Sequence, residues 1–173
     1  MKNKYSQLFL ISNVLIILDQ VTKFWITLHI PRHYSISVVE GFFNLTHIRN
    51  PGVAFGLFAS HESEYKVLFF VVTSLIAIIA ILIIFHQSPE NKKAARIGLI
   101  LIFSGAVGNL IDRIVFKEVI DFLDFFYNGF HWPAFNIADS CITIGVSFMM
   151  YDLFFGYPEN ANVSNPPNKS DHI

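Results

Sequence analysis

The stretch VLFFVVTSLIAIIAILIIF, residues 67–85, contains no charged side chain. An α-helix rises about 1.5 Å per residue, so a run of this length can cross the hydrocarbon core of a bilayer, which is about 30 Å thick. A helix also satisfies its own backbone hydrogen bonds where no water is present. The stretch therefore predicts a transmembrane helix and places the rest of the chain in or beside a membrane.

Three further stretches are nearly as apolar. They cover residues 8–28, 97–114 and 136–155, and we expect each to span the membrane as a helix. The first could be mistaken for a cleavable signal peptide, but no small-x-small cleavage site follows its apolar run. The later two contain polar groups that must lie near a helix end or face protein. These groups are Asn109, Asp112, Arg113, Asp139 and Asp152.

The overall composition agrees with a membrane protein. Of the 173 residues, 53% are hydrophobic and only 14% are charged, which is unlike an ordinary soluble domain. We predict one mainly α-helical membrane domain over residues 1–157 and a disordered, polar cytoplasmic tail over residues 158–173. The net charge of −1 gives no basis for nucleic-acid binding. Cys141 is the only cysteine, so no disulfide can form within the chain.

The loops predict an orientation in the membrane. The turn HQSPENKKAAR is short and basic, with Lys92, Lys93 and Arg96. The positive-inside rule therefore places it in the cytoplasm. With four spans, both termini are then cytoplasmic, and the segments 29–66 and 115–135 are extracytoplasmic.

The two outer segments carry different patterns. YSISVVEGFFNLTHIR, residues 34–49, has β-branched residues, partial alternation and a glycine break, which predict a short hairpin-like sheet. VIDFLDFFYNGFHW, residues 119–132, places Asp121, Asp124 and Asn128 on one side of a helical wheel and phenylalanines toward the other. We therefore expect a short interfacial amphipathic helix in this second segment.

Polar residues recur at helical spacing at the outer ends of the third and fourth spans. Residues three and four apart lie on one face of a helix, so each set forms a polar patch. On this geometry either Asp121 or Asp124 could oppose Asp139 across a polar pocket. The two sets are Asn109, Asp112 and Arg113, and Asn136, Asp139, Ser140 and Thr143.

Such a pair of carboxylates would have a defined chemistry. Two carboxylates close together in a poorly hydrated site cannot both ionise easily, so the pair holds a single proton. One can then act as a base toward water and the other as an acid toward a leaving amine, as in aspartic proteases. One interfacial carboxylate alone can instead be solvated, cap a helix or pair with a cation. The pair therefore favours hydrolysis without a metal or cofactor.

Other candidate residues have simpler interpretations. Asp19 and Lys23 are spaced i, i+4 in the first span, which predicts an internal ion pair. Cys141 is expected to pack as an apolar side chain. The HESEY run contains His61 but lacks the second histidine of a zinc-protease helix. We predict no metal site, because the spacing of the possible ligands is nonspecific. Those ligands are Asp121, Asp124, His131 and Asp139.

Five motifs follow one another along the chain: DQVTK (19–23), NLTHIRNPGVAFG (44–56), GAVGNLIDRI (105–114), VIDFLDF (119–125) and FNIADS (135–140). In order and spacing they resemble those of lipoprotein signal peptidases, also called signal peptidase II. The resemblance covers nearly the whole chain apart from the polar tail. It implies a bacterial inner-membrane aspartic endopeptidase that removes the signal peptide of a prolipoprotein, cutting just before a cysteine that already carries diacylglycerol.

The resemblance also implies residue roles. The family's catalytic pair falls on Asp121 and Asp139. Asp19 and Asp112 match residues that look structural in the family. The positions that shape the family's substrate pocket fall on Asn50, Gly52, Asn109, Arg113 and Asn136.

Family members also have a small extracytoplasmic sheet and a surface helix over the site, similar to the patterns at residues 34–58 and 115–130. The implied partners are diacylglyceryl-prolipoprotein substrates and membrane lipids. We expect a monomer that uses no nucleic acid, metal or cofactor.

Two other classes of protein would show different sequence patterns. A small transporter or ion-conducting protein predicts acidic groups at mid-depth within the spans and often repeated halves. Here the carboxylates cluster at one face, and no internal repeat is visible. In a noncatalytic membrane adaptor, Asp121 and Asp139 would have no common role.

Overall fold

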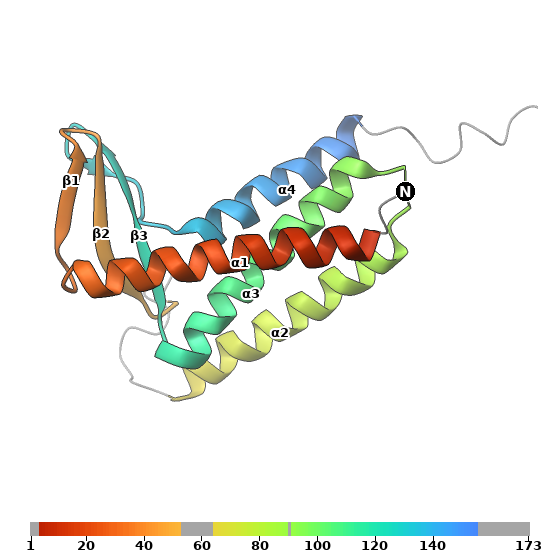
Figure 1. Cartoon of the computed structure of the whole chain (residues 1–173), viewed down its shortest axis with the longest axis horizontal. Coiled ribbons are helices and arrows are strands. Elements are labelled where there is room, and N and C mark those ends of the chain that lie inside the picture. The colour runs from red at the N-terminus through yellow and green to blue at the C-terminus, as the bar shows by residue number, and fades with distance from the viewer. Residues whose placement is uncertain (1–3, 53–63, 90, 156–173) are drawn as a thin grey trace, which may run out of the picture.

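Four long helices form the body of the molecule. The computed structural model describes residues 4–52, 64–89 and 91–155, and its helices are α1 (Lys4–His29), α2 (Glu64–Gln87), α3 (Lys93–Phe116) and α4 (Ile137–Phe155) (Figure 1). All four are long and apolar enough to cross a membrane. The four expected spans are therefore confirmed, and the first three helices extend one to four residues beyond each predicted end.

A small antiparallel sheet lies at one end of the helices, and the first described residues lie at the other (Figure 1). Its strands are β1 (Ser35–Val39), β2 (Phe43–Asn50), β3 (Val119–Tyr127) and β4 (Phe130–His131), in the order β1-β2-β3-β4. The sheet predicted over residues 34–49 is thus confirmed as the hairpin β1–β2. The fold class, mainly α with a small sheet, is confirmed as well.

The interfacial helix predicted for the second outer segment is wrong. Residues 119–131 form the hairpin β3–β4, and β3 pairs along β2, with Ile48 opposite Asp121. Asn128 and Gly129 have φ angles of 48° and 79° between the two strands. An Asn-Gly pair in this left-handed region is a strong signal for a tight hairpin turn. This turn and the partner strand outweigh the helical spacing of the polar residues.

The helices approach one another closely where glycines replace larger residues. Helix α3 packs against each of the other three helices. A Cβ atom added to Gly98 would lie 2.6 Å from the carbonyl oxygen of Gly145, and one added to Gly145 would lie 2.6 Å from that of Gly98. A Cβ on Gly105 would overlap the carbonyl oxygen of Ala138. These contacts hold α3 directly against α4, so that residues near position 109 lie beside the start of α4.

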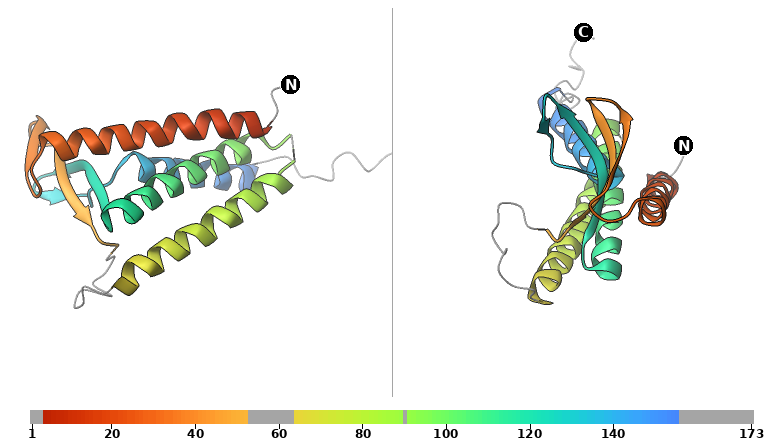
Figure 2. Two further views of the ribbon diagram at one scale, coloured as in Figure 1. Left: turned by 60° about the horizontal axis from the view of Figure 1, so that its bottom comes forward. Right: turned by 90° about the vertical axis from the view of Figure 1, so that its left-hand side faces the viewer.

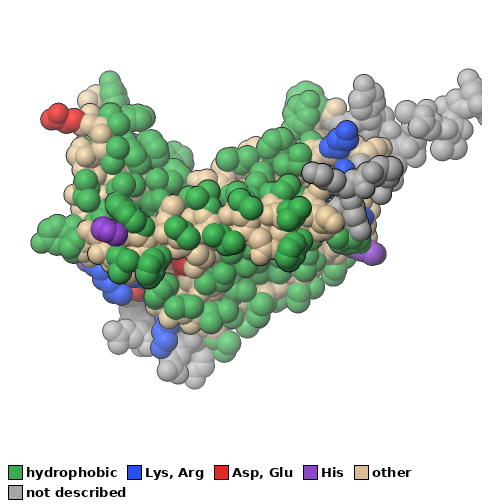
Figure 3. Space-filling model, viewed as in Figure 1, with side chains coloured by type: hydrophobic (Ala, Val, Ile, Leu, Met, Phe, Trp, Pro, Cys, Tyr) green, Lys and Arg blue, Asp and Glu red, His purple; other side chains and the backbone are tan. Residues whose placement is uncertain are grey.

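The helix faces that point away from the bundle are apolar. Phe9, Phe24 and Leu153 expose 67%, 64% and 73% of their surface. The space-filling view shows hydrophobic side chains over the sides of the helices and the faces of the sheet (Figure 3). Exposed apolar surface of this extent is typical of a protein surrounded by lipid.

Charged contacts tie the helices together at the end away from the sheet. The Lys4 ammonium donates to the carbonyl oxygen of His86 at 2.7 Å, and Lys92 pairs with Asp152 at 3.4 Å. The basic turn between α2 and α3 is therefore at this end, and the sheet lies at the other (Figures 1 and 2). Residues 53–63, with His61, and residues 156–173, which contain the predicted tail, lie outside the described residues.

Candidate active site

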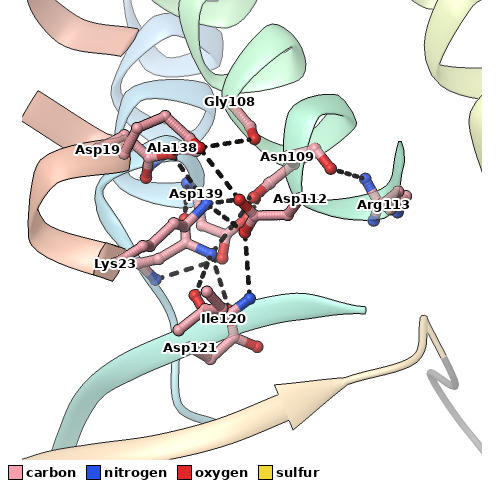
Figure 4. Close-up of polar contacts among 12 residues, drawn as sticks. Asp19, Lys23, Gly108, Asn109, Asp112, Arg113, Ile120, Asp121, Ala138 and Asp139 are labelled. Atoms are coloured by element: carbon pink, nitrogen blue, oxygen red, sulfur yellow. Dashed lines mark hydrogen bonds and ion pairs between the residues drawn. The ribbon is translucent and has the colours of Figure 1, made fainter. Parts of the chain in front are cut away.

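A buried charged cluster underlies the site. The Lys23 ammonium lies 2.8 Å from Asp19 and 2.9 Å from Asp112, and all three side chains are at most 2% exposed (Figure 4). The ion pair expected between Asp19 and Lys23 is therefore present, with Asp112 as a further member. The Gln20 amide donates to both carboxylates, at 3.1 Å and 3.0 Å. Each carboxylate thus has the ammonium and an amide N–H as partners, which offset part of the cost of shielding the charges from water.

The two carboxylates of this cluster also hold the neighbouring backbone. Asp19 accepts a hydrogen bond from the backbone N–H of Ala138 at 2.9 Å, in the first turn of α4. Asp112 accepts one from the N–H of Ile120 in β3 at 3.1 Å. Free N–H groups at a helix start favour a negative partner. The cluster thus joins α1, α3, α4 and β3 at the point where the motif residues meet.

Asp121 lies on β3, next to this cluster, and is 2% exposed. One of its oxygens accepts from the Asn136 amide at 2.8 Å, and the other accepts from the Asn50 amide at 3.0 Å. Burial raises the pKa of the Asp121 carboxyl to about 6; the hydrogen bond from Asn50 opposes the rise, and the negative charge of Asp139 adds to it. Desolvation disfavours the ionised carboxyl and so dominates.

Asp139 lies in the first turn of α4. Its Oδ1 accepts from the Asn109 amide at 2.7 Å. Its Oδ2 accepts from the backbone N–H of Asn136 at 3.3 Å, while its own N–H donates to the side-chain oxygen of Asn136 at 2.8 Å. This reciprocal arrangement is a capping box, in which two residues three apart satisfy each other's free N–H groups at the helix start. The cap fixes where Asp139 points.

Asn136 connects the two carboxylates. It is fully buried, and its amide nitrogen donates to Asp121 while its oxygen accepts from the N–H of Asp139. The same nitrogen also lies 3.2 Å from the carbonyl oxygen of Ile120. An Asn side chain has one acceptor and one donor end, and here the donor end faces the Asp121 carboxylate while the acceptor end faces the backbone N–H of Asp139. The Asp139 carboxylate is held by the backbone N–H of Asn136, so one residue contacts both carboxyls, one through its side chain and the other through its backbone.

Asn50 and Gly52 form a turn beside Asp121. The N–H of Gly52 donates to the Asn50 oxygen at 2.9 Å, so the amide nitrogen of Asn50 must face the carboxylate. Gly52 has a φ of 83°, and a Cβ there would overlap the ring of Phe70. A residue without a side chain is therefore required at this position.

Arg113 approaches the site from α3. It donates to the carbonyl oxygen of Asn109 at 3.3 Å, and its guanidinium lies 5.5 Å from the centre of the Phe70 ring. Its positive charge lies within electrostatic reach of the carboxylates of Asp139, Asp112 and Asp121. Arg113 thus supplies a cation beside the carboxyl pair, close to the Phe70 ring that also lies against Gly52.

Asp124 points away from this site. Successive side chains of a strand alternate between its faces, so Asp121 and Asp124 lie on opposite faces of β3. Asp124 accepts from Asn44 at 3.1 Å and contacts His131 at 2.8 Å. The interpretation that the two residues share a face depended on a helix and is wrong. Within residues 4–52, 64–89 and 91–155, no group of three His, Cys, Asp or Glu side chains could hold a metal ion.

The structure brings together all the residues to which the motifs assigned a role. Asp121, Asp139 and Asn136 form its centre, Asn50 with Gly52 and Asn109 with Arg113 flank it, and Asp19 and Asp112 lie beneath it. What the sequence did not indicate is the contact of Lys23 with Asn109, at 3.1 Å across 86 positions. The DQVTK motif contained the only signal, a lysine within an apolar span.

A family model described as "Signal peptidase (SPase) II" matches residues 11–155 of the chain. The chain belongs to the signal peptidase II family. Among its relatives is a lipoprotein signal peptidase of Desulforapulum autotrophicum, 48% identical over 149 residues, which are 86% of this chain and 92% of the relative. Another, from Syntrophus aciditrophicus, is 48% identical over 147 residues, covering 84% and 91% of the two chains.

Solved structures agree with the family. Two bacterial membrane enzymes determined by the in meso method superpose with TM-scores of 0.76 and 0.77 at 36% and 35% identity. The first alignment covers 86% of this chain and 88% of the other, and the second covers 88% and 95%. The resemblance drawn from the five motifs is therefore confirmed, and the protein is a peptidase of the signal peptidase II family.

Proposed function

We propose that the protein is a lipoprotein signal peptidase of the bacterial inner membrane that uses Asp121 and Asp139 as its catalytic pair. Its substrates are prolipoproteins whose lipobox cysteine carries diacylglycerol, and it cleaves the peptide bond just before that cysteine. The observation that carries the proposal is the pair of carboxyls from β3 and α4, coupled through Asn136 and held in unequal surroundings. Relatives with 48% identity are named for the same activity.

The unequal surroundings assign a role to each carboxyl. Asp121, with its pKa raised to about 6, holds the proton of the pair. Asp139 lies at a helix start, where a negative charge is favoured, and is therefore assigned the role of the base. Asp139 takes a proton from water as the water oxygen attacks the scissile carbonyl carbon. Asp121 then gives its proton to the leaving nitrogen as the C–N bond breaks. Return of one proton from Asp139 to Asp121 restores the pair.

The remaining motif residues bind the substrate. Asn50, Gly52, Asn109, Arg113 and Asn136 surround the carboxyl pair and supply polar contacts in a largely dry pocket. The space-filling view shows a notch between the sheet and α4, bordered by hydrophobic side chains (Figure 3). A hydrophobic border of this kind suits the acyl chains and the apolar signal peptide of a substrate that reaches the site from the bilayer. The structural residues Asp19 and Asp112 hold the elements that frame it.

The same proposal includes an orientation. The basic turn with Lys92, Lys93 and Arg96 is cytoplasmic by the positive-inside rule. Both termini are then cytoplasmic, and the sheet with the carboxyl pair lies at the extracytoplasmic face. A peptide bond presented there by a lipid-anchored substrate meets the carboxyls at the hydrocarbon edge. The enzyme acts as a monomer.

The direct experiment incubates the purified protein in detergent with a diacylglyceryl-modified prolipoprotein and follows release of the signal peptide. We expect release to continue in metal chelators, serine reagents and thiol blockers, because a carboxyl pair uses none of the groups they attack. The variant Cys141→Ser should keep its rate within about threefold of the parent, since a buried thiol of this kind contributes packing. Loss of release in a chelator with recovery on adding zinc, or an inactive folded Cys141→Ser, would contradict the mechanism.

The pH dependence tests the assignment of the acid. Because Asp121 must be protonated, kcat/KM should fall as the pH rises through about 6. In Asn50→Ala the ionised form of Asp121 loses a hydrogen bond that lowers its pKa, so this basic limb should move to higher pH. The matched control is Asn44→Ala, which removes an equivalent amide from Asp124 and should leave the limb in place. An unmoved limb in Asn50→Ala would reject Asp121 as the acid.

A further inference from the structure

Lys23 makes a contact that charge balance does not require. Lys23 is 1% exposed, and its ammonium lies within hydrogen-bond distance of three acceptors: Asp19 at 2.8 Å, Asp112 at 2.9 Å and the side-chain oxygen of Asn109 at 3.1 Å (Figure 4). An ammonium has three N–H donors and no acceptor, so this set uses all of them. Two of the partners neutralise its charge, and the third leads toward the carboxyl pair.

The contact determines the orientation of the Asn109 amide. Since Lys23 only donates, the oxygen of Asn109 must face it, and the amide nitrogen is then turned to Asp139 at 2.7 Å. Asn136 also donates to this oxygen, at 3.3 Å. A rotated amide would place N–H groups against the ammonium and an oxygen against the carboxylate, so both contacts would become repulsive. Lys23 therefore selects the orientation in which Asp139 receives a hydrogen bond.

A second route joins Lys23 to the same place. Asp19, held by Lys23, accepts from the backbone N–H of Ala138 at 2.9 Å. Ala138 precedes Asp139 directly. One route thus fixes the side chain of Asp139 and the other fixes its backbone, and both begin at the same ammonium.

We propose that Lys23 is a positioning residue for peptide hydrolysis, acting through Asn109 to hold the Asp139 carboxylate in the orientation needed to activate water. This inference rests on the proposed function, because it requires Asp139 to be the base. It assigns to the buried lysine a role in the rate of the reaction in addition to its ion pairs.

The substitution Lys23→Met keeps a long unbranched side chain and removes the donor. We expect kcat to fall by about 100-fold, as a displaced catalytic group can cause, with KM within about threefold of the parent. The acid limb of the pH profile should move to higher pH, because the loss of a positive charge makes the carboxyl pair easier to protonate. The charged groups around the pair are Lys23 and Asp19 on α1, Asp112 and Arg113 on α3, Asp121 on β3 and Asp139 on α4.

The matched control is Lys4→Met. Lys4 donates to carbonyl oxygens of His86 and Ser88 at the far end of the helices, so the same substitution there should leave kcat and the acid limb unchanged. If Lys23→Met does not accumulate folded, Lys23→Met with Asp112→Asn takes its place and is compared with Asp112→Asn alone. That double variant keeps the net charge of Lys23, Asp19 and Asp112 at −1, as in the parent, and leaves one unpaired carboxylate where Lys23→Met alone leaves two.

A double-mutant cycle separates positioning from general stability. If Lys23 acts through Asn109, the effect of Lys23→Met on kcat should shrink to less than about threefold in an Asn109→Ala background, since groups that act in one chain are not additive. Equal effects in both backgrounds, or an unmoved acid limb, would overturn the proposal. Asp139→Asn is measured in the same assay: if that variant is active, the proposed function has failed, and if it is inactive while Lys23→Met is normal, only this inference has failed.

Discussion

Replacing Asp121 or Asp139 with Asn should lower signal-peptide release by about 10⁴-fold or more while the protein stays inserted and folded. Asparagine has the size of aspartate but can neither take a proton from water nor give one to the leaving nitrogen. Each variant removes one half of the proton transfer. We expect the measured loss to be in kcat, because the substrate's lipid and signal peptide contact other parts of the protein.

Folding is the necessary control for these variants. In the parent protein, Asn50 and Asn136 both donate a hydrogen bond to Asp121. In Asp121→Asn the new amide nitrogen must face one of these two donors. The unsatisfied contact should destabilise the protein by about 1–3 kcal/mol. A thermal midpoint in detergent measures this cost independently of the rate, so a folded and inactive variant can be recognised.

The double variant Asp121→Asn with Asp139→Asn adds a sharper condition. Because the two carboxyls act in the same step, removing both should be hardly worse than removing one. A double variant slower than the parent by the product of the two single-variant effects would show two independent contributions. That result would contradict a shared proton.

Omitting the diacylglyceryl group from the substrate should lower kcat/KM by about 100-fold or more. Each CH₂ of an acyl chain buried in the membrane contributes about 0.8 kcal/mol to the free energy of binding. The chains therefore hold the scissile peptide at the interface, where the carboxyl pair lies. An unmodified peptide must reach the site without this anchor. The comparison uses one prolipoprotein sequence with and without the modification, in the same detergent. Equal rates would argue that the lipid is not recognised and would contradict the proposed substrate class.

The transmembrane helices could be predicted because their signal is local. The run from Val67 to Phe85 needs no knowledge of its neighbours, since its length and lack of charge determine what it can do in a bilayer. The hairpin β1–β2 was visible for a similar reason. In both cases the residues that decide the structure lie within the element itself.

The strand β3 was mistaken for a helix because two local signals disagreed. Asp121 and Asp124 have helical spacing, whereas Asn128 and Gly129 form a hairpin turn. The turn should have had the greater weight, because both positions adopt positive φ angles that few residue pairs accept. The mistake affected the choice of catalytic residue, because a helix puts both Asp residues on one face, whereas a strand separates them.

The contacts of the site depend on residues distant in the chain. Asn136 meets Asp121 across 15 positions, Asn50 meets it across 71, and Lys23 meets Asn109 across 86. The spacing of polar and apolar residues along the chain does not indicate such contacts. The motifs indicated which residues matter, but their polar partners and the orientation of each amide follow only from the packing of α3 against α4 and of β3 against α3 and the segment that precedes α4.

The most direct measurement of the central claim compares Asp121→Asn with Asp124→Asn at matched membrane levels, using release of the signal peptide from a diacylglyceryl-modified prolipoprotein. The two residues share one strand, carry the same substitution and are both buried, but they lie on opposite faces, and only Asp121 shares the Asn136 amide with Asp139. We predict that Asp121→Asn releases essentially no signal peptide and that Asp124→Asn stays within a few-fold of the parent. An active Asp121→Asn beside an inactive, folded Asp124→Asn would contradict the account.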